Sequence, residues 1–144
     1  MRVLVVVPTY NERGTLPALL AGITAQPDYG ALVVDDASPD GTGAIADEWA
    51  ARLPGRVRVL HRTGARGLGR AYAEGLTLAL EMQAPIVAQM DADLSHDPAY
   101  LPSLVAALDE ADLSIGSRYL NGISVVNWQL RRIALSTFAN RYIR

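Results

Sequence analysis

The chain has 144 residues, of which 50% are hydrophobic and 19% are charged, and its formal net charge is −2. These values are typical of one globular domain with a substantial core. No stretch approaches the roughly 18 apolar residues of a membrane-spanning helix, and the absence of cysteine excludes disulfides and thiolate metal sites.

Charge is distributed unevenly along the chain. Residues 115–144 contain five arginines and no acidic residue, whereas the first 114 residues contain 8 basic and 15 acidic groups. A basic tail on an acidic body indicates that the tail meets an anionic partner. The acidic body has no continuous basic face, so the composition argues against nucleic-acid binding.

Segments typical of strands and helices alternate from the first residues onward. We expect strands at 3–7, 31–34, 57–60, 86–90 and 113–115, and helices at about 15–25, 43–52, 68–82 and 98–110. The first strand segment has no polar alternation, as expected for a strand covered on both faces. This βα alternation predicts a three-layer α/β/α domain, residues 1–144, with a mostly parallel sheet.

Polar residues follow each of the five expected strands. In an open parallel sheet, ligands bind in the crevice outside the carboxyl ends of the strands. The polar clusters at those ends are 10–12, 35–36, 62–69, 91–93 and 117–118. Folding alone does not explain polar groups at five strand ends, so the sequence predicts a ligand site at this edge.

Asp91 and Asp93 end the apolar segment 86–90. Residues two apart in an extended segment point to the same side, so both carboxylates can converge on one point. That arrangement suits Mg²⁺ or Mn²⁺, which completes its coordination shell with water and a ligand's phosphates. The alternative is that acids after a strand only cap the next helix, and Asp97 before Pro98 resembles such a helix start.

Two common nucleotide-binding patterns are missing. A dinucleotide-binding Rossmann domain needs G-x-G-x-x-G after the first strand, but residues 8–14 lack these glycines and include Glu12. The cluster of Gly64, Gly67 and Gly69 follows the third expected strand instead. A P-loop needs lysine, and every basic residue of the chain is arginine. These absences argue against NAD-dependent chemistry.

Four motifs resemble family 2 glycosyltransferases with the GT-A fold, a Rossmann-like nucleotide-diphospho-sugar transferase fold. They are residues 5–12, 33–42, 67–72 and 90–98. The segments at 115–119, 127–128, 131–132, 135–136 and 139–142 are similar to the dolichyl/polyprenyl-phosphate mannose synthases. A loop at 121–126 departs from that family's pattern. Catalytic domains of the family continue for many more residues, so we expect the chain to be truncated at its C-terminal end.

This resemblance implies an inverting, metal-dependent hexosyltransferase that moves mannose from GDP-mannose to a polyprenyl (dolichyl-type) monophosphate. It also implies a cytoplasmic enzyme, peripheral at the cytoplasmic face of the membrane. A phosphate monoester has its second pKa near ~6 and arrives largely ionised, so in-line displacement requires no side-chain base. Other family 2 transfers, from a glucose or other donor or to a hydroxyl acceptor, stay open, as does a nucleotide-sugar-binding fragment without turnover.

The resemblance also implies a donor site. The residues assigned to the base and ribose are Pro8, Tyr10, Glu12 and Asp36, and Asp35 is also assigned to donor binding. Arg66 would reach the diphosphate, and Asp91 would contact the ribose and share the metal with Asp93. Ser95 would contact the metal through its side chain or a water molecule. The structural alternatives are packing for Tyr10, an Asx-turn or cap for the Asp35–Asp36 pair, and a solvated charge for Arg66.

The acceptor phosphate would meet residues of the basic tail. Arg118 follows the fifth expected strand and is also assigned a catalytic role, together with Asp91 and Asp93. Arg132 and Ser136 are spaced i, i+4, so one helix face presents a guanidinium and a hydroxyl together, which suits a phosphate. The alternative is an amphipathic surface helix whose arginines are solvated.

Overall fold

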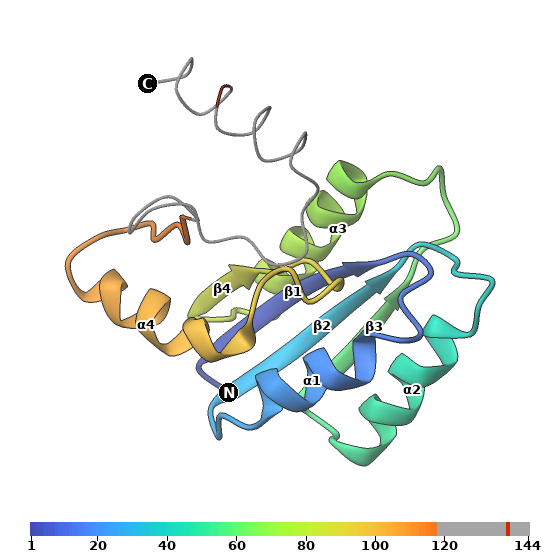
Figure 1. The fold of residues 1–144 in the computed structure, drawn as a ribbon, viewed down its shortest axis with the longest axis horizontal. Coiled ribbons are helices and arrows are strands. Elements are labelled where there is room, and N and C mark those ends of the chain that lie inside the picture. Colours follow the sequence, from blue (N-terminus) through green and yellow to red (C-terminus); the bar gives the residue numbers. More distant parts are fainter. Residues whose placement is uncertain (118–137, 139–144) are drawn as a thin grey trace.

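The computed structural model describes residues 1–117 and residue 138 (Figure 1). Strands and helices alternate as expected up to the fourth strand. The elements are β1 (Val3–Thr9), α1 (Leu16–Thr24), β2 (Tyr29–Asp35), α2 (Thr42–Arg52), β3 (Val57–His61), α3 (Leu68–Glu81), β4 (Ile86–Gln89), the 3₁₀ turn η1 (Pro98–Tyr100), α4 (Leu101–Ala106) and the 3₁₀ turn η2 (Ala107–Asp109).

The four strands form one parallel sheet in the order β3-β2-β1-β4 (Figure 1). From β1 the chain moves outward to β2 and β3, and α3 then carries it back to the other side of β1, where β4 pairs. Strand order therefore reverses between β1 and β4. At such a reversal the connecting loops diverge, and the crevice they leave at the carboxyl ends of the strands is the usual ligand position in open α/β sheets.

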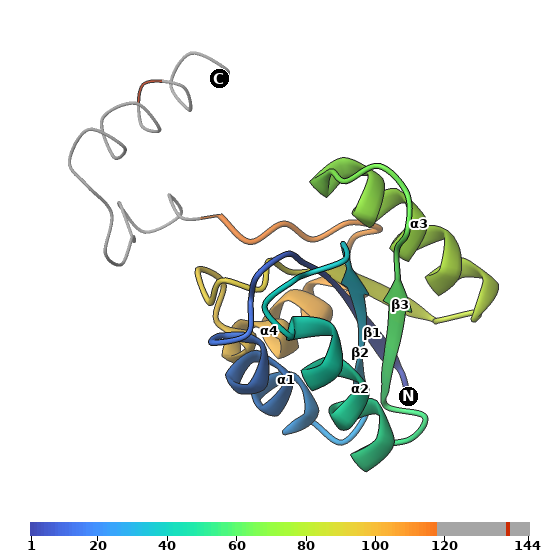
Figure 2. The same cartoon turned by 90° about the vertical axis from the view of Figure 1, so that its right-hand side faces the viewer.

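Helices cover both faces of the sheet, as Figure 2 shows from the side. Val3, Val5 and Val7 of β1 pack in a core with residues of α1, α2 and α4. Leu4 and Val6 point to the opposite face and pack with residues of α3. Every residue of β1 is buried, which explains why its sequence does not alternate between apolar and polar. The expected three-layer α/β/α architecture is confirmed.

Helix α3 approaches the sheet closely at Gly75. A Cβ atom at this position would lie 2.6 Å from Cγ1 of Val6 and 2.8 Å from Cγ2 of Val34. Since such distances are below van der Waals contact, only glycine lets the helix backbone sit this near to β1 and β2.

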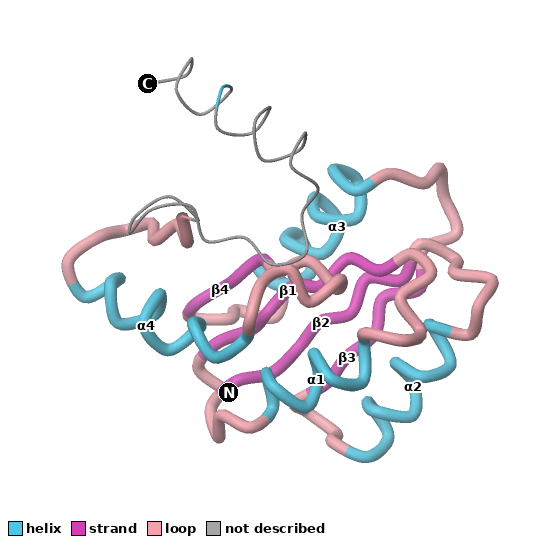
Figure 3. The backbone as a smooth tube through the Cα atoms, in the orientation of Figure 1, coloured by secondary structure: helices cyan, strands magenta, loops and turns pink. Residues whose placement is uncertain are grey.

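The prediction of a fifth strand at residues 113–115 is wrong. This segment is irregular, as Figure 3 shows, and Leu113 and Ile115 are 73% and 74% exposed. Its apolar–polar alternation is typical of a strand, but a strand forms only where a neighbour supplies hydrogen bonds, and the described residues supply none here. The helix expected at 98–110 is also shorter, because it is divided into η1, α4 and η2.

Within the described residues, no helix is long and apolar enough to cross a membrane.

The close approach at Gly75 gives a stability test with a control in the same helix. We expect Gly75→Ala to lower the free energy of unfolding by about 1–3 kcal/mol, because the added methyl overlaps Val6 and Val34. Gly69→Ala, whose Cβ would meet nothing within 4 Å, should instead raise it by up to about 1 kcal/mol through helix propensity. Urea denaturation measures both, and equal effects of the two variants would contradict the packing argument.

Candidate active site

A cavity of about 230 Å³ opens where strand order reverses. Its walls come from the loops after β1, β2 and β4 and from the first turn of α3. The lining residues are Pro8, Thr9, Tyr10, Glu12, Asp36, Leu68, Ala71, Asp91, Ala92 and Asp93. The structure therefore brings together six residues that the sequence assigned to donor or metal binding. Asp35, Arg66 and Ser95 are not among the lining residues.

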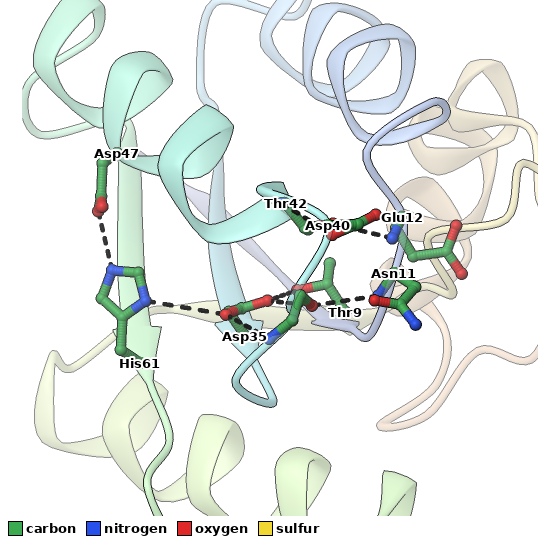
Figure 4. A network of polar contacts seen from close by, with 9 residues as sticks. Thr9, Asn11, Glu12, Asp35, Asp40, Thr42, Asp47 and His61 are labelled. Carbon is green, nitrogen blue, oxygen red and sulfur yellow. Dashed lines mark hydrogen bonds and ion pairs between the residues drawn. The ribbon is translucent and has the colours of Figure 1, made fainter.

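Asp35 faces the interior instead of the cavity, and its side chain organises the surrounding loops (Figure 4). Asp35 as a whole is 3% exposed. It accepts hydrogen bonds from the Thr9 hydroxyl (3.2 Å), the Ser38 hydroxyl (2.6 Å) and the Ser38 backbone N–H (3.2 Å). Nδ1 of His61 lies 3.9 Å from Asp35 Oδ2. The carboxylate thus joins the end of β1 to the β2–α2 loop, as in the turn alternative for this residue.

A second set of contacts fixes the loop after β1 against the loop after β2 (Figure 4). The Glu12 backbone N–H donates to the Thr42 hydroxyl at 2.9 Å, and that hydroxyl donates to Asp40 Oδ1 at 2.6 Å. The Thr42 hydrogen bond holds the pKa of Asp40 below its ordinary value. The Glu12 side chain accepts from the Thr15 hydroxyl at 2.6 Å. Glu12 is therefore held in place where it borders the cavity.

Asp36 lines the cavity and forms an ion pair with Arg62, whose side chain is only 1% exposed. The charge of Arg62 balances that of the carboxylate. Arg62 pairs with Asp36 Oδ1 and, at 2.7 Å, with Glu74 of α3. The Gly67 N–H donates to the other Asp36 oxygen at 2.9 Å. Arg62 also donates to the Ala65 carbonyl at 3.2 Å. The Arg62 contact holds the pKa of Glu74 below its ordinary value. This network fixes both ends of the glycine-rich loop.

Arg66 lies over the ring of Tyr10 at the rim of the cavity. Its Cζ is 4.6 Å from the ring centroid, and its Nη1 donates to the Tyr10 hydroxyl at 2.6 Å. A guanidinium over an aromatic face is held by a cation–π attraction. Arg66 is thus partnered within the protein rather than solvated alone, and it stands beside Tyr10, which does line the cavity.

The two aspartates after β4 differ in how they are held. Asp91 is half-buried and accepts a hydrogen bond from the Tyr72 hydroxyl at 2.9 Å. Burial, and then the Asp91 hydrogen bond, raises the pKa of Tyr72, so the phenol is a neutral donor. Asp93 is exposed and accepts locally from the Ser95 N–H at 2.9 Å. Ser95 itself is exposed and outside the lining.

The carboxylate pair fits a cation that arrives together with a ligand. No group of three or more histidine, aspartate or glutamate side chains able to hold a metal ion exists among the described residues. Asp91 and Asp93 both line the cavity, however. Mg²⁺ is commonly bound by only one or two carboxylates plus substrate phosphates and water, so this donor set is sufficient for a cation shared with a diphosphate.

Sequence reasoning assigned no role to Arg62 or Tyr72. Arg62 was part of the polar cluster after β3, and its position directly after the strand was the only available signal. Tyr72 was included as the last residue of the motif at 67–72. The expected acceptor residues Arg118, Arg132 and Ser136 lie outside the described residues.

The Arg62 network predicts a specific loss of stability. Arg62→Met leaves the Asp36 carboxylate buried without its cation, which is strongly unfavourable. We expect a clearly lower midpoint of thermal unfolding than for Arg58→Met, which removes an exposed arginine from β3, the strand that precedes Arg62. Circular dichroism would measure both, and matching midpoints would mean that the ion pair contributes little.

The family model described as glycosyl transferase family 2 matches residues 4–144. The chain is 51% identical over 145 residues to a polyprenol monophosphomannose synthase of Mycolicibacterium smegmatis, covering 99% of the chain and 55% of that protein. It is 49% identical to an undecaprenyl-phosphate mannosyltransferase of Micrococcus luteus, covering 100% of the chain and 59% of that protein.

A solved structure is also similar. It is mannosyltransferase PcManGT from Pyrobaculum calidifontis in complex with GDP-Man and Mn²⁺, with a TM-score of 0.52 and 36% identity over 64% of this chain and 27% of that chain. The chain spans less than two thirds of the length of the curated relatives described above. The expected GT-A fold is confirmed, and the chain belongs to glycosyltransferase family 2.

Proposed function

We propose that this chain takes part in the transfer of mannose from GDP-mannose to a polyprenyl monophosphate, with inversion at the anomeric carbon. The observation that supports it best is the cavity at the β1–β4 reversal, where Asp91 and Asp93 face the polar ends of β1 and β2. The two relatives are named for mannosyl transfer to polyprenol or undecaprenyl phosphate, and the similar solved structure contains GDP-Man.

In this proposal the base and ribose of the donor occupy the part of the cavity formed by Pro8, Tyr10, Glu12 and Asp36. Asp36 and Glu12 are carboxylates, which accept hydrogen bonds from base N–H and ribose O–H groups. Both are held by internal contacts before any ligand arrives, so little ordering is needed on binding. Arg66, at the rim, would leave Tyr10 and contact the diphosphate.

Asp91 and Asp93 would hold Mg²⁺ or Mn²⁺ together with the diphosphate, Asp91 also contacting the ribose. The cation supplies Lewis-acid stabilisation of charge on the departing GDP. The similar mannosyltransferase is in complex with both GDP-Man and Mn²⁺, which supports this part of the proposal. Ser95, which is exposed next to Asp93, is assigned at most a contact through water.

The acceptor half rests on the arginine-rich sequence after residue 117. Arg118, Arg132 and Ser136 would bind the terminal phosphate of the lipid, and the attacking oxygen would already be ionised near neutral pH. Positioning by arginines then accounts for much of the acceleration, since no proton has to be removed. A lipid acceptor would require contact with a membrane surface, and the proposal is that the protein associates peripherally at the cytoplasmic face.

Donor binding is tested by calorimetric titration of GDP, GDP-mannose and UDP-glucose, each with and without Mn²⁺. We expect GDP-mannose to bind with the help of metal, and Asp93→Ala to weaken that binding at least about tenfold because a metal ligand is lost. Asp28→Ala removes an exposed carboxylate away from the cavity and should bind normally. A preference for UDP-glucose would favour a different family 2 transfer, and metal-independent binding in all variants would refute the metal assignment.

The acceptor assignment is tested by Arg132→Ala. We expect kcat/KM for transfer to polyprenyl phosphate to fall about 100-fold, since a charge-assisted bidentate contact with the phosphate is removed. The dissociation constant of GDP-mannose should stay unchanged. Arg52→Ala, which alters an exposed arginine on α2 that does not line the cavity, serves as the control. Loss of donor binding together with transfer would count against a separate acceptor role.

A further inference from the structure

The Tyr72 hydroxyl connects two layers of the fold at the cavity. Tyr72 belongs to α3, which covers one face of the sheet, and Asp91 belongs to the loop after β4. Their hydrogen bond, 2.9 Å between the phenol oxygen and Asp91 Oδ1, spans 19 positions of sequence. The hydrogen bond to Asp91 therefore comes from a side chain of α3, an element that is separate from the β4 loop in which Asp91 lies. The contact thus fixes one carboxylate of the proposed donor site.

Helix geometry explains why Tyr72 reaches this point. In a strand–helix–strand crossover the helix runs opposite to the strands, so the first turns of α3 lie near the carboxyl ends of the sheet. Long side chains on a helix lean toward its N-terminus. The Tyr72 ring therefore leans toward the edge at which β4 ends. Gly75, one turn later, lets the helix lie close enough to the sheet for the phenol to reach Asp91.

A phenol is a suitable hydrogen-bond partner for a carboxylate that is to bind a cation. A phenol donates one hydrogen bond and adds no positive charge, so Asp91 keeps its full negative charge. An arginine or lysine at the same place would offset that charge and weaken the attraction for a cation. The Tyr72 contact also occupies one oxygen of Asp91 and fixes the plane of the carboxylate, so the second oxygen is presented from a defined position.

We propose that Tyr72 is a positioning residue, which holds Asp91 so that its second oxygen meets the nucleotide and its cation in one orientation. This inference rests on the proposed function, because it assigns Asp91 to that ligand. The two aspartates then have different roles. Asp91 is oriented before ligand binding by a contact from α3, whereas Asp93 lies in an exposed turn and accepts a hydrogen bond from the nearby Ser95 N–H.

A double-mutant cycle tests whether Tyr72 acts through Asp91. The variants are Tyr72→Phe, Asp91→Asn and both together, and calorimetry gives the dissociation constant of GDP in the presence of Mn²⁺. Tyr72→Phe keeps the ring and removes only the hydroxyl, and we expect about tenfold weaker binding. In the Asp91→Asn background the same change should have little further effect, because the group it positions is already altered. Tyr100→Phe, at an exposed tyrosine, is the control and should bind normally.

Several results would overturn the inference, and they separate it from the proposed function. Independent losses that multiply in the double variant would show that Tyr72 acts only through general stability. Unchanged GDP binding by Tyr72→Phe, with binding weakened by Asp91→Asn, would reject the positioning role and leave the donor site intact. Unchanged binding by Asp91→Asn would reject the donor site, and the role of Tyr72 with it.

A second variant covers the case in which Tyr72→Phe loses its fold. Asp91→Glu keeps the charge but moves the carboxylate by one methylene away from the position that Tyr72 defines. We expect it to weaken GDP binding in Mn²⁺ about as much as Tyr72→Phe. Full binding by Asp91→Glu would show that any nearby carboxylate suffices, which contradicts positioning. Thermal unfolding of each variant confirms that binding is compared between folded proteins.

Discussion

Complete burial of β1 is the constraint on which the remaining structure depends. Its backbone groups pair with β2 on one edge and β4 on the other, and its side chains enter both cores. A strand so enclosed carries polar residues only where they find partners, as Thr9 does at its last position, or beyond its end, because an unpaired polar group inside would be costly. Tyr10 and Glu12 therefore appear where β1 stops. Because β4 pairs with β1 on the edge opposite to β2, the loop after β4 lies beside the carboxyl end of β1. The topology of the sheet therefore determines where the cavity lies.

Buried carboxylates order the loops around that cavity. Asp35 and Asp36 are 3% and 6% exposed, and each must find donors because a desolvated charge without partners is strongly unfavourable. Asp35 takes its donors from Thr9 and Ser38, whereas Asp36 takes them from Arg62 and the Gly67 N–H. Loops that would otherwise move are thus fixed by the same charges that make the site polar. A ligand that enters finds the walls largely formed, which lowers the entropy lost on binding.

The sequence predicted what depends on local pattern and missed what depends on distances between layers. Four strands and the position of Asp91 and Asp93 followed from apolar runs and from where they stop. The adjacent residues Asp35 and Asp36 were assigned together, although side chains alternate along a strand, and only Asp36 borders the cavity. Leu113 and Ile115 carried a strand pattern without a partner strand among the described residues. The contacts of Arg62 and Tyr72 could not be predicted from the residues directly after a strand or in the 67–72 motif, because they depend on how close α3 lies to the sheet.

The contrast between Asp91 and Asp93 follows from the same geometry. A carboxylate that recognises a defined group gains from being fixed, because less freedom is lost on binding. In the proposed site Asp91 would contact the ribose as well as the cation, whereas Asp93 would contact only the cation, whose position follows that of the diphosphate. Asp91 lies near enough to α3 to be held by Tyr72, and Asp93, two residues further into the loop, is exposed. Spacing of two residues thus places both carboxylates at one cavity, where the Tyr72 hydroxyl donates to Asp91 and the Ser95 N–H donates to Asp93.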